Sequence, residues 1–340
     1  MVKKYLSNIG IVLCVATLVA CGLGEHEQTT ATDQKLESHS AIPIILVGYG
    51  PPSSSFSQGL THIGESIKEK FGNRVEVSYI YNILDHGYSA ASAQIELVEE
   101  DAITLGYVTM SEGIPALEVA ALPFLFSDAD TVRVAMDGPL GQAAIESIEA
   151  NSALKVLGFY ENGFRHISNS VRPVHTPEDL TNMKIRVLAI EKPALEMMGA
   201  APIVTPIPLL FDGLASGELE GQENPFENVV TYELYKHQSY YTETAHSYLS
   251  RPIFVNKVTF EAWPADLQTE FKLVVKEAIN LQRRLHDQAE IDAAQIIRNS
   301  GGEIVQLTAE ERALFVEAVS SIYEEAKDKY SAELLTLVGL

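Results

Sequence analysis

Cysteine is nearly absent from this 340-residue chain, and both copies, Cys14 and Cys21, lie close to its start. The rest of the chain therefore has no disulfide to form, and its fold must depend on the packing of an apolar core. Apolar residues make up 46% of the sequence, which is ordinary for a globular protein, and the length suits two domains.

Positive charge is also scarce. The chain has 24 lysines and arginines against 46 aspartates and glutamates, so its formal net charge is −22. Such a surface repels nucleic acid and anionic lipid, and we expect no nucleic-acid partner. Because cations are rare here, any arginine that reaches a cleft becomes a candidate for binding an anion.

Several motifs that carry chemistry are missing from the sequence. It has no phosphate-binding glycine loop, no paired cysteine and histidine spacing of a metal site, and no Gly-x-Ser-x-Gly elbow. The nine histidines are scattered, and no nucleophile is evidently paired with a base. We therefore expect a protein that is not an enzyme and that holds no metal or cofactor.

Only one uncharged apolar run stands out, at residues 9–20, behind Lys3 and Lys4. It is well short of the roughly 20 residues that a membrane-spanning helix needs. It ends in Leu18-Val19-Ala20-Cys21, and the whole pattern resembles a bacterial lipoprotein signal peptide at residues 1–20. The resemblance implies that Cys21 becomes an acylated N-terminus, which would anchor the protein to a membrane on its periplasmic face. An ordinary secretory signal cleaved at the same place is the alternative.

The region after the signal begins with a linker and continues as an alternating strand and helix pattern. Residues 21–40 are polar and unpatterned, as in a flexible tether. The apolar run at 44–47 predicts a buried strand, the helical spacing of apolar residues over 60–71 predicts a helix, and the alternation over 75–81 predicts a second strand. This order indicates an α/β fold.

Later segments predict a second unit and a long helix. Thr176 and Pro177 cap a short helix, and a strand follows at 183–187. After Pro264, apolar residues recur at helical spacing with no glycine or proline until Gly301. About 35 helical residues span roughly 50 Å, which exceeds one small domain, so this helix should cross two.

Five segments occur in an order and spacing that match one known family. They are Leu122-Pro123-Phe124-Leu125-Phe126, Asn162-Gly163-Phe164-Arg165 with Ser168-Asn169, Thr176-Pro177-Glu178-Asp179-Leu180 running into Lys184-Ile185-Arg186-Val187, Gly221-Gln222-Glu223-Asn224-Pro225, and Trp263-Pro264-Ala265-Asp266-Leu267-Gln268. Each segment alone is a weak signal. The ordered set resembles the solute-binding proteins of tripartite ATP-independent periplasmic (TRAP) transporters, in their dicarboxylate-binding-type branch.

The resemblance implies a two-domain periplasmic-binding-protein fold of α/β, type II-like architecture, braced by the long helix. Domain I would hold residues 41–162 and 251–285, and domain II would hold 163–250 and 286–340. A ligand would be trapped when the domains close.

The function implied is that of an extracytoplasmic receptor. It would capture an organic acid and deliver this carboxylate ligand to the membrane subunits of a TRAP permease. Two alternatives stay open: a ligand sensor for a membrane kinase, and an enzyme on a similar scaffold.

The resemblance also assigns the ligand contacts. Arg186 would be the main anchor, because a planar guanidinium offers two parallel donors that match a carboxylate. Arg165 would add a second positive contact. Asn224 would hydrogen-bond the ligand from a turn fixed by Pro225, while Phe124 and Phe164 either wall the pocket or pack in the core.

The far end of the pocket departs from the family pattern. The stretches at 53–55 and 89–93 carry hydroxyls rather than charge, which makes Ser54 and Ser92 candidate contacts. Four tyrosines, Tyr49, Tyr79, Tyr81 and Tyr88, are further candidates, with placement on the surface as the alternative for each. A second carboxylate buried there would lack a cationic partner, which is costly. The sequence therefore favours a monocarboxylate over a short dicarboxylate.

Overall fold

The computed structural model describes residues 40–340, which form one compact unit. The expected signal peptide, Cys21 and most of the polar tether lie outside the described residues. Within 40–340, no helix is both long enough and apolar enough to cross a bilayer.

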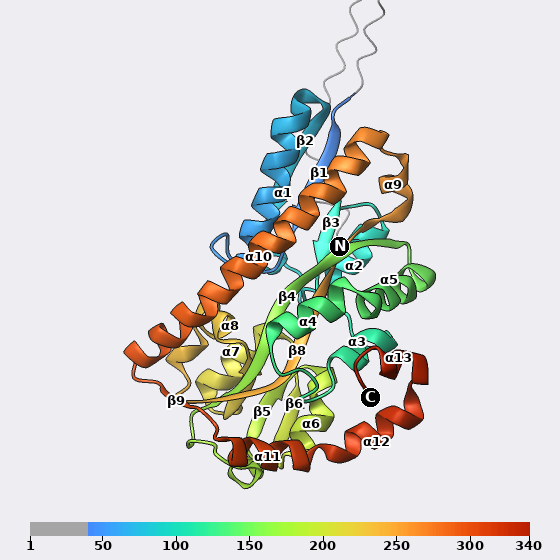
Figure 1. The fold of residues 1–340 in the computed structure, drawn as a ribbon. Coiled ribbons are helices and arrows are strands. Elements are labelled where there is room, and N and C mark those ends of the chain that lie inside the picture. The colour runs from blue at the N-terminus through green and yellow to red at the C-terminus, as the bar shows by residue number, and fades with distance from the viewer. Residues whose placement is uncertain (1–39) are drawn as a thin grey trace, which may run out of the picture. The chain divides into compact units, whose positions relative to one another are not determined.

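A single nine-stranded sheet organises the described chain (Figure 1). The strands follow the order β2-β1-β3-β8-β4-β7-β5-β6, and β9 pairs with β8. Their bounds are β1 Ile42–Val47, β2 Val75–Ile80, β3 Leu105–Tyr107, β4 Leu154–Asn169, β5 Lys184–Val187, β6 Ala201–Val204, β7 Gly221–Asn224, β8 Tyr240–Asn256 and β9 Glu303–Val305.

Helices cover the sheet and connect its strands. Their bounds are α1 Ser55–Phe71, α2 Ala93–Glu99, α3 Pro115–Ala120, α4 Ala129–Asp137, α5 Pro139–Asn151, α6 Lys192–Met197, α7 Ile207–Ser216, α8 Phe226–Thr231, α9 Lys257–Ala262, α10 Ala265–Asn299, α11 Ala309–Ala318, α12 Ser320–Lys329 and α13 Ala332–Thr336. The α/β class predicted from the sequence is confirmed, as is the first strand, helix and strand sequence of β1, α1 and β2. The short helix expected after Thr176 is a single 3-10 turn, Pro177–Leu180.

The two longest strands, β4 and β8, run antiparallel and side by side through the middle of the sheet (Figure 1). Tyr160 of β4 lies opposite Arg251 of β8, and Arg165 lies opposite Ser247. The β1–β3 group joins β8, whereas β5–β7 join β4, so these two strands connect the two parts of the sheet.

A β-bulge interrupts β4 between those two register pairs, at Gly163. Gly163 has a φ of +80°, in the left-handed region that favours glycine. A Cβ atom there would lie 2.1 Å from Nε2 of His286 on α10. Only a glycine therefore fits where the helix meets the strand.

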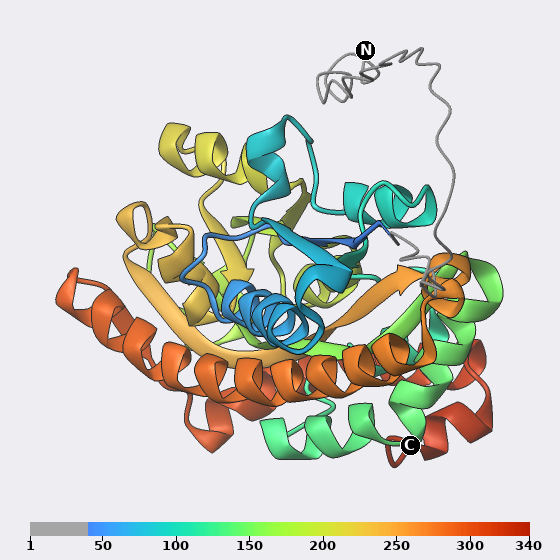
Figure 2. The same cartoon turned by 90° about the horizontal axis from the view of Figure 1, so that it is seen from above.

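The long helix α10 has 35 residues, which confirms the length predicted after Pro264. Its buried stripe includes Leu267, Phe271, Val274 and Ala278. Figure 2 shows α10 extending along the strands, with α1 beside it.

The apolar core is divided into clusters rather than continuous. The largest draws its buried residues from 44–160 and 248–279. Two others draw theirs from 167–319 and from 210–297. The proposed domain boundaries remain a prediction, to which this separation of the cores lends support.

Candidate functional site

A cavity of about 200 Å³ opens where the two parts of the sheet meet. Its lining consists of three arginines, a few polar side chains and apolar residues, and it contains no aspartate or glutamate. The residues are Tyr49, Leu84, Ala90, Ala91, Ser92, Val108, Thr109, Arg165, Arg186, Leu188, Pro206, Ile207, Pro208, Asn224, Asn228 and Arg251. In a chain with about twice as many acids as bases, this concentration of cations marks the cavity as an anion site.

Four of the seven predicted ligand contacts lie in this lining: Arg165, Arg186, Asn224 and Ser92. Ser54 does not line it. The Ser54 side chain instead caps α1, where its Oγ accepts a hydrogen bond from the Ser57 N–H at 3.2 Å.

The two phenylalanines also lie outside the lining. The Phe124 ring packs beneath the guanidinium of Arg312, with 5.0 Å between Arg312 Cζ and the ring centroid. The Phe164 ring meets Tyr248 edge to face, with centroids 5.0 Å apart. Both placements agree with the core-packing alternative.

Arg165 is held firmly by a carboxylate. It lies on β4 with a side chain 1% exposed, its Nε donates to Glu223, and its Nη2 donates to Asn224 Oδ1 at 3.1 Å. Burial alone would lower the pKa of Arg165, but the charge of Glu223 outweighs it and the pKa is raised. Nη1 has no hydrogen-bond partner and remains free to donate.

Arg186 on β5 is equally buried but has no such carboxylate. Its Nε donates to the backbone oxygen of Thr205 at 2.8 Å, and within 40–340 no carboxylate lies within 4.0 Å of it. Burial lowers the pKa of Arg186 to about 10. The guanidinium therefore stays charged at neutral pH and lacks a counter-ion.

Asn224 ends β7, directly before Pro225, as the sequence predicted. Its Oδ1 accepts from Arg165, and also from Asn228 Nδ2 at 3.3 Å. Its Nδ2 donates to Gln222 Oε1. These bonds fix the amide at the cavity wall.

Arg251 is a third cavity arginine that the sequence reasoning missed. Its side chain is only 4% exposed, and its Cζ lies 5.6 Å from the Tyr49 ring centroid and 5.3 Å from that of Phe56. Neither Nε nor Nη1 has a hydrogen-bond partner. The signal was an arginine placed directly before the apolar run Pro252-Ile253-Phe254-Val255. Its presence removes the premise on which the monocarboxylate prediction rested.

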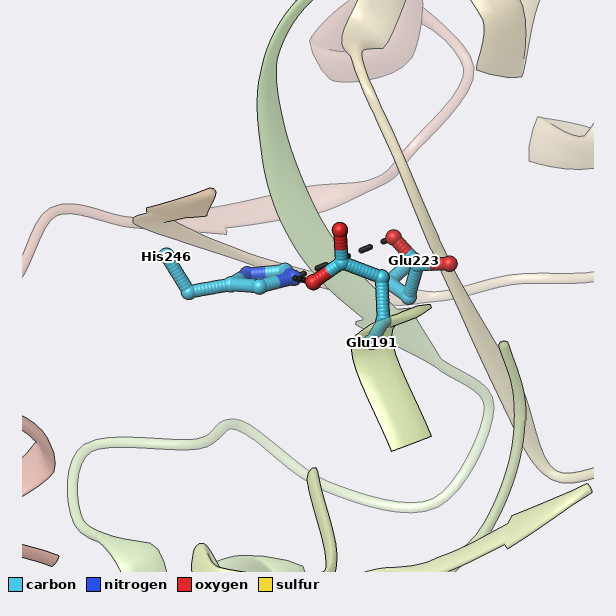
Figure 3. A group of neighbouring side chains, drawn as sticks. All are labelled: Glu191, Glu223 and His246. Carbon is cyan, nitrogen blue, oxygen red and sulfur yellow. Dashed lines mark ion pairs between the residues drawn. The ribbon is translucent and has the colours of Figure 1, made fainter. Parts of the chain in front are cut away.

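Behind Arg165 lies a buried group of Glu191, Glu223 and His246 (Figure 3). The His246 Nε2 is 3.8 Å from a carboxylate oxygen of each glutamate. These are metal-ligand types, and within 40–340 only this trio brings three candidate ligand atoms within 4.8 Å of one another. However, Glu223 already forms an ion pair with Arg165. The positive charge of that guanidinium would repel a metal cation bound to the same carboxylate.

The same group fits a role as the charge partner of Arg165. Burial would raise the pKa of Glu223, but Arg165 and His246 outweigh it and lower the value to about 2. Burial and the charge of Glu223 raise the pKa of Glu191, whose Oε1 accepts from Ser247 at 2.7 Å. The trio therefore supplies a fixed negative charge that orients Arg165.

Many known proteins resemble this chain, and three of them illustrate the match. The C4-dicarboxylate-binding periplasmic protein DctP of Rhodobacter capsulatus is 28% identical over 252 residues, which cover 71% of this chain and 75% of that protein. A TRAP periplasmic solute-binding protein from Bordetella, with ligand density assigned to pantoate, has a TM-score of 0.80 at 25% identity and covers 87% of this chain and 98% of its own. Another from Shewanella oneidensis, with bound succinate, has a TM-score of 0.81 at 22% identity. It covers 88% of this chain and 98% of its own.

The matching family model spans residues 47–329, nearly the whole described chain, and is that of bacterial extracellular solute-binding proteins, family 7. The two-part α/β fold, the long helix and the arginine-lined cavity all agree with that match. This chain belongs to that family.

Proposed function

We propose that this protein is an extracytoplasmic receptor that captures an organic acid and delivers it to the membrane subunits of a TRAP permease. The observation that carries the proposal is the cavity lining, which holds three buried arginines and no carboxylate. The relatives support it, because the Rhodobacter protein is named for C4-dicarboxylates and the ligand density of the Bordetella protein was assigned to pantoate, another carboxylate.

Arg186 is the proposed main anchor for the ligand carboxylate. Its charge has no ion-pair partner in the described chain, and a strand position limits its movement. Arg165 and Asn224 add donors at the same end of the cavity. A carboxylate there would accept charge-assisted hydrogen bonds that water does not match once the site is closed.

Closure is supported by contacts between segments that the proposed domain boundaries assign to different domains. Ser55 donates its N–H and its hydroxyl to the Glu227 carboxylate, both at 3.0 Å. The Tyr232 hydroxyl donates to the backbone oxygen of Tyr49 at 3.2 Å. These bonds would stabilise the closed arrangement around a bound ligand.

A thermal-shift screen of organic acids tests the binding function. A ligand at 100 times its dissociation constant stabilises a protein that binds only when folded by about 2.7 kcal/mol, so hits should be clear. Small-angle scattering should then show a smaller radius of gyration with the hit bound. Mass spectrometry should recover the ligand chemically unchanged.

An Arg186→Ala variant is the matched control for this screen. It should keep its fold and show a much smaller thermal shift at the same ligand concentration. If no organic acid shifts the wild type, or if the variant responds equally, the proposed site is wrong.

We also propose that the protein is anchored by lipid at Cys21. The support is the Leu18-Val19-Ala20-Cys21 sequence behind the short apolar run. Intact-mass analysis of protein from membranes should show an acylated N-terminus at Cys21, and Cys21→Ser should abolish it. An unmodified wild-type N-terminus would contradict the anchor.

A further inference from the structure

The arginine-lined cavity adjoins a second and larger hollow. This hollow, which we call the chamber, has a volume of about 440 Å³ and shares the lining residues Thr109 and Leu188 with the cavity. Most of its lining is apolar and consists of Ile95, Met110, Ile114, Leu188, Ile190 and Pro193. A ligand confined to the cavity of about 200 Å³ would therefore leave this apolar surface in contact with water.

The walls of the chamber come from both parts of the sheet. One wall is formed by segment 109–114, which follows β3, and the other by segment 188–193, which follows β5. β3 pairs with β8, whereas β5 pairs with β7. A ligand group in the chamber would thus touch the same two parts of the chain that meet around the cavity.

Leu188 connects the proposed carboxylate anchor to the chamber. It lies two residues after Arg186 of β5, in extended backbone with φ −75° and ψ 155°. Side chains two residues apart in an extended chain point to the same side, and both of these residues line the cavity. Because Leu188 also lines the chamber, a ligand whose carboxylate binds Arg186 can extend past Leu188 into it.

The chamber offers apolar contacts but no partner for a second charged group. Its lining contains no lysine or arginine, so an anionic group there would find no counter-ion. The Glu118 carboxylate is already engaged, since it accepts from the Gly113 N–H at 2.9 Å and the Tyr330 hydroxyl at 2.8 Å and pairs with Lys329 Nζ at 2.8 Å. Glu112 is exposed to water, where an ion pair contributes little. An uncharged hydrocarbon group therefore fits the chamber best.

We propose that the chamber is a subsite for a hydrocarbon tail, and that the natural ligand is an organic acid whose carboxylate binds the arginines while its apolar chain occupies the chamber. This inference rests on the proposed receptor function and specifies its ligand class. Leu188, Met110 and Ile190 would determine specificity through the tail. Each methylene group that the chamber removes from water should raise the affinity about threefold to fourfold.

Calorimetry with butyrate, hexanoate and octanoate tests the chamber, because these acids share a carboxylate and differ only in chain length. The wild type should bind octanoate about tenfold or more tightly than butyrate, with hexanoate between them. Arg186→Ala should weaken the binding of all three acids. Octanoate binding that this variant leaves unchanged would be nonspecific adsorption and would overturn the subsite.

Ala189→Trp should fill the chamber, since Ala189 is exposed and lines the chamber but not the cavity. It should weaken octanoate binding about tenfold and change butyrate binding by less than about threefold. Met110→Gln keeps the length of the side chain but makes its end polar, so it should also weaken octanoate selectively. Ala150→Trp, at an exposed position of α5 outside both linings, is the matched control and should leave every affinity unchanged.

The possible failures of the subsite and of the receptor function are distinguishable. Affinities that stay flat or fall with chain length, together with a hit in the organic-acid screen, would overturn the subsite and leave the receptor function intact. An octanoate preference that survives unchanged in both Ala189→Trp and Met110→Gln would place the tail elsewhere and would also overturn the subsite. Binding of no acid in either experiment would overturn both.

Discussion

The two sides of the cavity use the same side chain in opposite settings. Arg165 is buried against Glu223, with Glu191 and His246 behind it, whereas Arg251 is buried against aromatic rings without a carboxylate. The first arginine is fixed and already neutralised, while the second is fixed but still charged. Burial and residue type alone therefore do not identify a ligand anchor, because the counter-ion decides how much attraction is left for a ligand.

The largest expected effect comes from breaking the paired side. Arg165→Ala leaves Glu223 buried without its arginine partner, which should lower the free energy of unfolding by about 3–5 kcal/mol. Denaturant titration without ligand measures this loss. Adding Glu223→Gln should recover part of it, and an unchanged unfolding free energy in Arg165→Ala would show that the pair contributes no stability.

Arg186→Ala should instead act on binding. Removing one partner of a buried ligand ion pair costs about 2–5 kcal/mol, so the affinity should fall roughly 30-fold or more. Calorimetry with a hit from the screen measures it. Arg186→Lys should also bind poorly, since it lacks the two parallel donors. Near-wild-type affinity in the alanine variant would refute the anchor.

Acid should weaken the paired side through His166, the neighbour of Arg165 on β4. Burial and the charges of His246 and Arg165 lower the pKa of His166 to about 3, and its Nδ1 accepts a hydrogen bond from the Ala245 N–H at 3.1 Å. The unfolded chain therefore binds the proton more readily. The stability that depends on keeping His166 neutral is fully present above about pH 6.5. It is lost as the pH falls towards 3, at about 1.4 kcal/mol per pH unit.

Between pH 6.5 and 5, this histidine should therefore cost about 2 kcal/mol of stability. Glu191 and Glu290, whose pKa values are raised mainly by burial, act in the opposite direction. A comparison of wild type with His166→Asn cancels their contribution, because the amide oxygen can still accept the Ala245 bond. Parallel stability curves for the two proteins over this range would contradict the prediction.

The smallest effect is expected at Ser54, which caps α1 outside the cavity. Losing a helix N-cap costs about 1 kcal/mol, so Ser54→Ala should lower stability by that amount and leave affinity unchanged. Ser92→Ala, in the lining, is the paired test for a ligand contact. A fall in affinity for Ser54→Ala would restore Ser54 as a contact.

Much of the fold was readable from local patterns. The spacing of apolar residues gave α1 and α10, and alternation gave β2, because these signals depend only on helix and strand geometry. The division of the core was not readable, since it depends on which segments meet across the sheet.

The candidate site was predictable only in part. Arg165, Arg186 and Asn224 stand in ordered motifs, so resemblance brought them together. Arg251 stands in no motif, and its place in the cavity follows from the pairing of β8 with β4. Arg165 is neutralised because it pairs with Glu223, a residue far away in the sequence. No local sequence pattern distinguishes a paired guanidinium from an unpaired one.

The bulge at Gly163 has a consequence for evolution of the ligand range. It lies between the register positions of Arg165 and Arg251, and its tight fit against His286 admits no side chain. The backbone separation of Arg165 and Arg251 is thus set by the register of β4 and β8, not by the side chains of the lining. Substitutions in the lining can exchange one chemical group for another, but they leave this backbone separation unchanged.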